Sequence, residues 1–533
     1  MLGGLRGTSP EDSRRYIAEG WWTDATLGEL LAAGLRTGRG NAFVVHSATR
    51  PWSGTMGGVE DLARRAATGM QARGVGPGTV VSFQLPNWVE AAATFYAASL
   101  LGATVVPIVH FYGARELTYI LEQSQPRVHV TASSFGHNDY IANLAAIDHG
   151  ADVVTVGGDG GVATFDALTS GPPLAAPVTT DPSTAALIGY TSGTTANPKG
   201  VVHSHRTISA EIRQLGATQG PDSLPPLVGS PVGHATGMLS ALLLPVNLGR
   251  SIHLIDVWDP AAVLAAMLTD DLSSGGGATY FLTSLLDHPD FTADHLTRMK
   301  YAGMGGSAVP RAVAERATDL GITVYRMYGS TEHPSITGCT WADPLDKRLG
   351  TDGRPLPGCA VRLVDEHGVD VGPGEPGEIL SRGPDCFMGY TDPALTAAAF
   401  DSEGWYHTGD IAVADGDGYV AITDRKNDVI IRGGENISAA EVEELLLHLP
   451  GVAEAAVVAA PDARLGEHAC AFLRMHAGTP APNLESMRAS LDRAGLTRQK
   501  WPEEVVEIAE FPRTPSGKVQ KFVLRDRLRA RSV

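Results

Sequence analysis

The segment from residue 79 to residue 109 constrains the fold more than any other part of the chain. It opens with TVVSFQLPN, a β-branched run that ends in a Pro-Asn turn, and continues into an alanine-rich stretch with helical character. Gly102 separates this stretch from TVVPIV, a second β-rich run. Strand, helix and strand within about thirty residues predict a buried βαβ unit. Residues 91–109 are also nearly long enough to span a bilayer, but their division at Gly102 favours the βαβ unit.

The same alternation of strand and helix recurs elsewhere in the chain. Residues 126–132 and 151–156 are short apolar runs typical of buried strands. Residues 58–74 and 310–321 have helical spacing and end in glycine. Alternating elements of this kind predict parallel sheets with helices on their faces. Over about residues 340–426 the pattern changes to short strands broken by Gly and Pro turns, which predicts a small β-rich region.

The chain is longer than one hydrophobic core usually accommodates. Its 533 residues predict two or more domains. We expect residues 1–426 to form a large N-terminal domain and residues 427–533 a small C-terminal domain. Early in the second segment, Glu441 follows Ser438 at the spacing of a capping box, which marks the start of a helix. The predicted fold class is α/β, with parallel and mixed sheets flanked by helices, a β-rich subdomain and a small α+β C-terminal domain.

Charge and cysteine content limit the ligands and the compartment. The chain has 59 acidic and 41 basic residues, a net charge of −18, which repels nucleic acid and anionic membranes. An anionic ligand must therefore be held by a local site. The four cysteines include no C-x-x-C pair, so their spacing indicates neither a disulfide framework nor a zinc site and fits a reducing cytoplasm. The first thirty residues or so contain no apolar run, which argues against a signal peptide.

One flexible segment, YTSGTTANPKGVVHSH at residues 190–205, has the composition of a polyanion site. Gly193 and Gly200 let the backbone approach a ligand, and Lys199 supplies a positive charge. Its hydroxyl donors are Thr191, Ser192, Thr194 and Thr195. This inventory suits a nucleotide triphosphate. The segment is not a Walker A loop, however, because Pro198 stands where that loop needs its second glycine.

The segment resembles the phosphate loop of the adenylate-forming (ANL) superfamily, which includes acyl-CoA synthetases, firefly luciferase and the adenylation domains of peptide synthetases. Five other segments resemble motifs of the same family and follow in its order. They are GMGGSAVP (303–310), YRMYGSTE (325–332), GWYHTGDIA (404–412), DRKNDVII (424–431) and RTPSGKVQK (513–521). The resemblance covers the chain from about residue 30 to its end, and it implies the ANL fold with a mobile C-terminal domain.

The resemblance implies a nucleotide site. The residues that match the family's nucleotide contacts are Thr191, Ser192, Gly193, Thr194, Thr195, Lys199, Gly305, Gly306, Ser307, Tyr328, Gly329, Thr331, Asp410 and Arg425. By this resemblance, Tyr328 would stack on adenine and Asp410 would accept hydrogen bonds from the ribose. Glu332 would hold Mg²⁺, a hard cation that prefers oxygen ligands, with Thr191 or Thr194 as a further ligand.

The resemblance also implies which residues are catalytic: Lys518, Lys199, Glu332 and Thr331. Lys518 would swing against the carboxylate and the α-phosphate, and the C-terminal domain would then rotate about a hinge at Asn427. The family usually has Lys or Asp at this hinge position, so Asn427 is a departure from its pattern. Four arginines near the end of the chain are expected to form a solvated face of a basic helix: Arg525, Arg527, Arg529 and Arg531.

The segment SPVGHATGMLSALLLPVNLG, residues 230–249, corresponds to the border of the acyl site in the family. It is mostly apolar and has no acidic residue to meet an amino acid's ammonium group, which favours a fatty, alicyclic or aryl acid. His234 in this segment either positions the thiol or closes the pocket. The residues expected to line the acyl site and the CoA tunnel are His234, Gly237, Met238, His333, Gly433 and Gly434.

Together these resemblances imply an ATP-dependent acyl-CoA synthetase that uses ATP, Mg²⁺ and coenzyme A. It would form acyl-AMP and pyrophosphate from a carboxylic acid and ATP, and would then transfer the acyl group to CoA. Two alternatives stay open: an acyl-AMP ligase that loads a carrier protein, and a nucleotide-binding relative without turnover. The expected partners are small molecules, with no nucleic acid and no integral membrane segment. A homodimer is compatible with the sequence.

Overall fold

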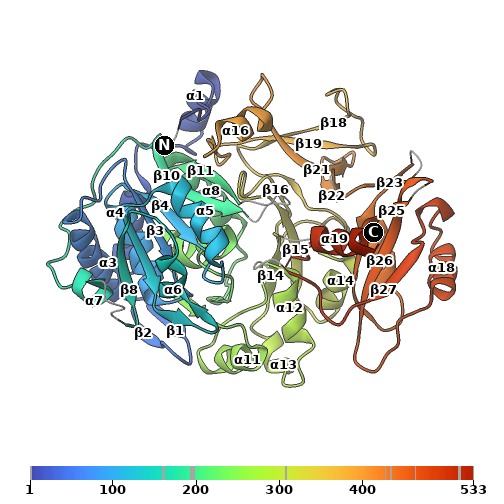
Figure 1. Ribbon diagram of the computed structural model, residues 1–533, viewed down its shortest axis with the longest axis horizontal. Helices are drawn as coiled ribbons and strands as arrows, with labels where there is room; N and C mark the ends of the chain where they lie inside the picture. The colour runs from blue at the N-terminus through green and yellow to red at the C-terminus, as the bar shows by residue number, and fades with distance from the viewer. Residues whose placement is uncertain are drawn as a thin grey trace.

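The chain folds around one large sheet and several smaller ones. Figure 1 shows the eight-stranded sheet at one end of the molecule and the C-terminal segment, in red, at the other. The computed structural model describes residues 3–158, 163–191, 198–306, 309–426, 428–432, 435–462, 464–513 and 518–531. Of residues 435 and 436 only the backbone is described.

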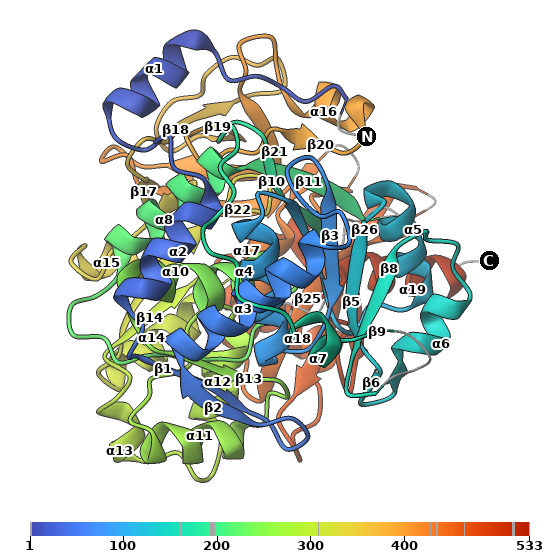
Figure 2. The same cartoon turned by 90° about the vertical axis from the view of Figure 1, so that its left-hand side faces the viewer.

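The predicted βαβ unit lies at the centre of the eight-stranded sheet. β3 (Val80–Gln84) and β4 (Thr104–Ile108) are parallel neighbours, and α4 (Val89–Leu100) connects them. Every residue of α4 is buried. The helix packs against α2 (Leu27–Thr37) and α3 (Met56–Gln71), and Figure 2 shows the three helices together. Among the described residues, no helix has both the length and the apolar character that a membrane span requires.

The large sheet extends to both sides of this unit in the order β20-β11-β10-β4-β3-β5-β8-β9. The two strands predicted next to it are confirmed as β5 (Val128–Ala132) and β8 (Asp152–Val156), both parallel to their neighbours. The two predicted helices are confirmed as α3 and α14 (Arg311–Asp319). The remaining strands of this sheet are β20 (Gly389–Tyr390), β11 (Lys199–Ser204), β10 (Ala185–Thr191) and β9 (Ala163–Thr164).

Three four-stranded sheets and a two-stranded sheet of β6 (Ser134–Phe135) and β7 (Asn138–Asp139) are the other sheets described in the first 425 residues or so. One contains β12 (Leu227–Val228), β13 (Ile252–Ile255), β1 (Ala42–His46) and β2 (Trp52–Thr55). Another contains β14 (Tyr301–Met304), β15 (Thr323–Tyr328), β16 (Thr337–Gly338) and β17 (Arg354–Pro355). The predicted β-rich region contains the antiparallel sheet of β18 (Ala360–Val364), β19 (Pro376–Arg382), β21 (Tyr406–Ala414) and β22 (Val420–Arg425).

The C-terminal segment has a sheet and a core of its own. The strands are β23 (Ile430–Arg432), β24 (Glu435–Ile437), β25 (Val452–Asp462), β26 (Gly466–Met475) and β27 (Glu504–Glu507). The helices are α17 (Ala439–Leu447), α18 (Leu484–Arg493) and α19 (Lys521–Arg531). Leu524 and Leu528 of α19 pack in one cluster with Val458 and Phe472 of the sheet. A separate sheet and core are compatible with a domain over residues 427–533, whose limits stay a prediction.

The capping box predicted at the start of α17 is only half formed. The Ser438 side chain accepts a hydrogen bond from the Glu441 N–H, as expected. The Glu441 carboxylate pairs with the Lys500 ammonium at 2.6 Å. A charged partner within reach thus holds the carboxylate that the capping box would have directed back to the Ser438 N–H.

The prediction of a solvated basic face on α19 is wrong for Arg525. Its guanidinium pairs with the Asp428 carboxylate at 2.5 Å, and both side chains are largely buried. Arg527 and Arg529 are exposed, as predicted. The ion pair ties α19 to the start of the C-terminal segment, so Arg525 is a structural residue and not a solvated one.

We expect Gly28→Ala to destabilise the fold, because Gly28 marks the closest approach of α2 to α4. A β-carbon at residue 28 would overlap the backbone carbonyl oxygen of Ser99. Because this oxygen belongs to the main chain of α4, it cannot move without displacing the helix. The substitution should lower the free energy of unfolding by about 3 kcal/mol, measured as an earlier midpoint of urea denaturation. Gly40→Ala is the control, because that position has open space around it. Equal midpoints for the two variants would contradict this packing.

Candidate active site

A hairpin of the large sheet carries Lys199 to the site. β10 and β11 are antiparallel, with Thr191 opposite Lys199, so the phosphate-loop segment joins these two residues. The Lys199 ammonium lies 5.5 Å from the centre of the Tyr390 ring, within the range of a cation–π contact. Four predicted contacts of the loop lie outside the described residues and stay predictions: Ser192, Gly193, Thr194 and Thr195.

Thr331 and Glu332 follow β15 in a turn that is held from two sides. A β-carbon at Gly329 would overlap a carbonyl oxygen across the turn, so the turn requires glycine there. The His203 ring, on β11, donates from Nε2 to the Thr331 carbonyl oxygen at 2.7 Å. The Tyr390 hydroxyl donates to Oε1 of the buried Glu332 carboxylate at 2.8 Å. These two hydrogen bonds fix the turn and orient the Glu332 carboxylate.

A second carboxylate, Asp410, lies on β21 between an aromatic hydroxyl and a guanidinium. The Tyr328 hydroxyl donates to Oδ2 of Asp410 at 2.7 Å, and the Arg425 guanidinium lies 3.1 Å from Oδ1. Arg425 is the register partner of Asp410 on β22, so the sheet itself aligns the pair. Burial raises the pKa of Asp410, and Arg425 acts in the opposite direction. Tyr328 and Arg425 thus hold the nearly buried carboxylate of Asp410 in place.

Lys518, from the C-terminal segment, brings a further cation to the same place. Its ammonium interacts electrostatically with Arg425, Asp410 and Glu332. Burial lowers the pKa of Lys518 to about 8, and the positive charge of Arg425 acts in the same direction, while the two carboxylates raise it. The cations and carboxylates predicted from separate segments of the sequence therefore converge in one region of the fold.

The predicted acyl segment lies beside these groups. Residues 230–249 contain α9 (Ala235–Gly237), a π-helical turn (Met238–Leu243) and α10 (Leu244–Leu248). Burial lowers the pKa of His234 to about 4, and Lys518 adds to the shift, so the imidazole is neutral at pH 7. A narrow cavity of about 10 Å³ lies next to it, lined by Gly189, Met238, Leu239, Thr331, Pro334 and others. A β-carbon at Gly237 would overlap a backbone oxygen, so this segment is tightly packed.

Two glycines continue the site after β14. A β-carbon at Gly305 would lie 2.9 Å from the carbonyl oxygen of Met327, and Gly306 has a left-handed backbone with φ of +76°. Both positions therefore favour glycine, which leaves a bare backbone there. Ser307, Asn427, Gly433 and Gly434 lie outside the described residues, and their predicted roles in binding, hinge motion and the CoA tunnel stay predictions.

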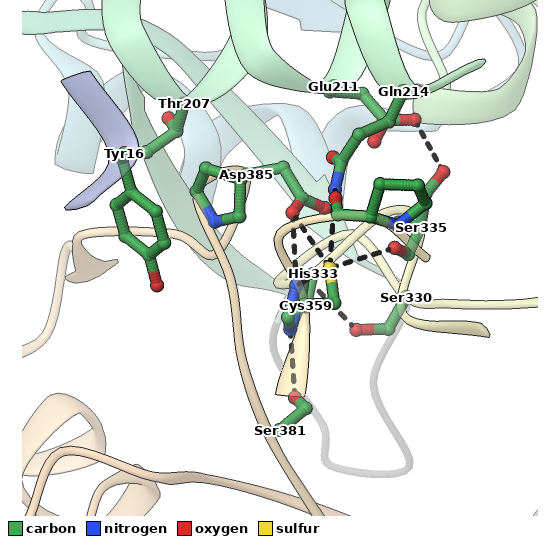
Figure 3. A network of polar contacts seen from close by, with 12 residues as sticks. Tyr16, Thr207, Glu211, Gln214, Ser330, His333, Ser335, Cys359, Ser381 and Asp385 are labelled. Atoms are coloured by element: carbon green, nitrogen blue, oxygen red, sulfur yellow. Dashed lines mark hydrogen bonds and ion pairs between the residues drawn. The ribbon is translucent and has the colours of Figure 1, made fainter. Parts of the chain in front are cut away.

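The prediction that His333 lines the acyl pocket is wrong. Its side chain is 0% exposed, and both ring nitrogens have partners: Nδ1 lies 2.8 Å from the Ser381 hydroxyl and Nε2 lies 3.1 Å from an Asp385 oxygen. The partners of the two neighbouring residues differ: Glu332 pairs with Tyr390, whereas His333 pairs with Ser381 and Asp385. His333 therefore belongs to a buried polar network (Figure 3).

Sequence reasoning missed Tyr390. This residue lies on β20, at the edge of the large sheet, beyond the segments that resemble family motifs. It contacts two predicted catalytic groups at once, through its hydroxyl to Glu332 and its ring face to Lys199. The sequence signal available was a Gly-Tyr dipeptide, which has no distinctive chemistry of its own.

Comparisons with known proteins identify the family. The family model described as AMP-binding enzyme matches residues 39–391, and the model described as AMP-binding enzyme C-terminal domain matches residues 441–518. The chain is 34% identical over 525 residues to a medium-chain fatty-acid–CoA ligase of Escherichia coli K12, covering 96% of this chain and 92% of the relative. It is 33% identical over 472 residues to a feruloyl-CoA synthase of Amycolatopsis, covering 88% and 93%.

A solved structure resembles the whole fold. ATP-bound MatB from Rhodopseudomonas palustris superposes with a TM-score of 0.83 at 27% identity, covering 94% of this chain and 99% of that one. The chain therefore belongs to the AMP-binding enzyme family, whose members form adenylates. Within that family it is an acid–thiol ligase of the acyl-CoA synthetase type.

We expect Tyr390→Phe to lower adenylation activity by about tenfold, because a buried carboxylate loses the donor that orients it. The ring stays in place against Lys199, so the change removes only the hydroxyl. The measurement is the rate of ATP–pyrophosphate exchange with a saturating acid. Tyr119→Phe is the control, since that hydroxyl accepts from Gln123 on the surface of α5 (Ala114–Ser124). An unchanged rate in Tyr390→Phe would show that this hydroxyl does not position Glu332.

Proposed function

We propose that the chain catalyses ATP-dependent synthesis of an acyl-CoA from a carboxylic acid, in two steps. A carboxylate first attacks the α-phosphate of ATP, which gives acyl-AMP and pyrophosphate. The thiol of CoA then displaces AMP. The observation that supports this most strongly is the electrostatic contact of Lys518, from the C-terminal segment, with Asp410 and Glu332 of the N-terminal segment.

The first step joins two anions, so it needs positive charge near the reacting atoms. We assign this role to Lys199 and Lys518, which would offset the charge of the carboxylate and the α-phosphate in a partly dry site. Asp410 would accept hydrogen bonds from the ribose, and Arg425 would hold the orientation of Asp410. The second oxygen of Glu332 is the type of donor that Mg²⁺ prefers, so the ion fits this residue, where it would neutralise phosphate charge.

The acid is proposed to be a fatty, alicyclic or aryl carboxylate. The segment of residues 230–249 is mostly apolar and has no carboxylate that would bind an ammonium group. His234 is neutral at pH 7 and so adds no charge to the pocket. The names of relatives that act on a medium-chain fatty acid and on ferulate support the same range of substrates.

The second step is proposed to follow a rotation of residues 427–533 that withdraws Lys518 and admits the thiol. Between the two parts lies a polar contact that can open without exposing a hydrophobic core: the Arg311 N–H donates to the Glu444 carboxylate at 3.1 Å. Gly433 and Gly434 would then line the path of the pantetheine chain. Motion of this kind sets the turnover of many enzymes.

We also propose a cytoplasmic location and CoA, not a carrier protein, as the acceptor. The location rests on the four unpaired cysteines, which suit a reducing compartment. The acceptor rests on the CoA ligases among the relatives. Mass spectrometry of the products with CoA present and absent tests the acceptor directly. A homodimer is compatible with this function, and sedimentation velocity measures it.

Lys518→Ala should lower the rate of acyl-AMP formation from ATP by about 100-fold or more. The rate of CoA transfer to a supplied acyl-adenylate should be largely kept. The reason is that the ammonium is needed only while two anions approach each other. Pyrophosphate release measures the first step, and thioester formation measures the second. Arg527→Ala is the matched control, because it removes one exposed positive charge from the same segment. Equal losses in both half-reactions would contradict this division of roles.

The rate of adenylation should fall as the pH rises through about 8. The pKa of Lys518 is lowered to about 8, so its ammonium is present below that pH and lost above it. The pH profile of kcat/KM for ATP–pyrophosphate exchange measures this, because it reports on the free enzyme. In Lys518→Arg the guanidinium stays charged, and whatever activity is left should lack the alkaline fall. A flat wild-type profile up to pH 10 or so would rule out this assignment.

A further inference from the structure

A buried group of three chemically different side chains lies behind Glu332: His333, Cys359 and Asp385. Nε2 of His333 lies 3.1 Å from Oδ1 of Asp385, and Sγ of Cys359 lies 3.5 Å from each of these two atoms. The side chains of His333 and Asp385 are 0% exposed. Figure 3 shows the three side chains turned toward one another, each from a different part of the chain.

We propose that His333, Cys359 and Asp385 bind a Zn²⁺ ion. Zinc takes thiolate, imidazole and carboxylate ligands in a tetrahedron, with bonds of about 2.3 Å to sulfur and about 2.0–2.2 Å to nitrogen and oxygen. Such a tetrahedron separates nitrogen from oxygen by about 3.4 Å and sulfur from either by about 3.6 Å. The observed separations of 3.1, 3.5 and 3.5 Å lie close to these values.

The three donor atoms also surround a common point beside Gly383. A β-carbon on Gly383 would lie 2.6 Å from His333 Nε2, 2.8 Å from Cys359 Sγ and 3.0 Å from Asp385 Oδ1. Any other residue at this position would place its side chain among the three donors. Glycine leaves that space clear, which is what an ion bound by all three requires.

The surrounding groups suit a metal ligand set. Nδ1 of His333 pairs with the Ser381 hydroxyl at 2.8 Å, which leaves Nε2 as the atom that faces the metal. The Gln214 amide donates to Cys359 Sγ at 3.3 Å, a contact that fixes the position of the sulfur. Outer contacts of this kind orient the ligands of metal sites in proteins.

A further oxygen donor lies beside these three side chains. Glu211, on α8 (His205–Thr218), is fully buried next to Asp385. Its Oε1 accepts from the Ser335 hydroxyl at 2.8 Å, while Oε2 receives no hydrogen bond from any group that the structure describes. Oε2 of Glu211 is therefore a donor available for the fourth position.

The cysteine spacing predicted no zinc site, since such sites are usually recognised by pairs of ligands close in sequence. Here the ligands come from the turn after β15, the approach to β18 and the segment after β19, which only the fold brings together. The ion would join these segments to one another and thereby fix the turn that carries Thr331 and Glu332. The proposal does not depend on the proposed function.

The test is the zinc content of the full chain, expressed in zinc-supplied cells and purified without chelators. We expect about one ion per chain by mass spectrometry of the metal. Cys359→Ser should contain almost none, whereas Cys339→Ser, which changes another buried cysteine, should keep its zinc. The wild-type chain produced with Co²⁺ should show a thiolate-to-cobalt charge-transfer band and the visible bands of a tetrahedral ion.

The cobalt spectrum needs no variant, so it decides the matter even where Cys359→Ser fails to fold. The proposal is overturned if the wild-type chain contains only a small fraction of an ion and cobalt gives no thiolate band. It is also overturned if folded Cys359→Ser, with an unchanged circular dichroism spectrum, keeps the zinc of the wild type. Loss of acyl-CoA synthesis with zinc retained would count against the proposed function alone.

Discussion

The site depends on one electrostatic constraint: positive charge from the C-terminal segment must lie next to carboxylates of the N-terminal segment. Lys518 interacts with the carboxylates of Asp410 and Glu332, and Arg425 pairs with that of Asp410. Burying a single charge is costly, but charges of both signs offset that cost when they are held together. In the proposed rotation of the C-terminal segment, the arrival or departure of ligand charge would change this balance.

A rigid support lies behind this charge cluster. Tyr390 holds Glu332 from the edge of the large sheet, and His203 holds the Thr331 carbonyl oxygen from the adjacent strand. On the other side of the turn, His333 is anchored to Asp385 and Ser381. Neighbouring residues of one turn thus have different partners: Glu332 pairs with Tyr390, whereas His333 fastens the turn to the protein interior. Such support is what a preorganised site requires.

The sequence predicted much of this because the chemistry of the site uses local motifs. The βαβ unit was visible in the change from β-branched to alanine-rich residues around Gly102, and the polyanion segment that ends near Lys199 was visible in its hydroxyl and glycine content. The predictions failed where a distant partner took over. Arg525 looked solvated but pairs with Asp428, and Glu441 looked like half of a capping box but pairs with Lys500. Periodicity carries no information on such partners.

By itself the sequence determined the order of elements, the fold class and the types of residue proposed to act on a nucleotide, since these follow from local composition and spacing. Only the tertiary structure decided which groups meet. The pairing of Tyr390 with Glu332, the direction of His333 and its meeting with Cys359 and Asp385 all join residues far apart in the chain. Contacts of this kind arise from packing and register, which place side chains in space without leaving a pattern along the chain.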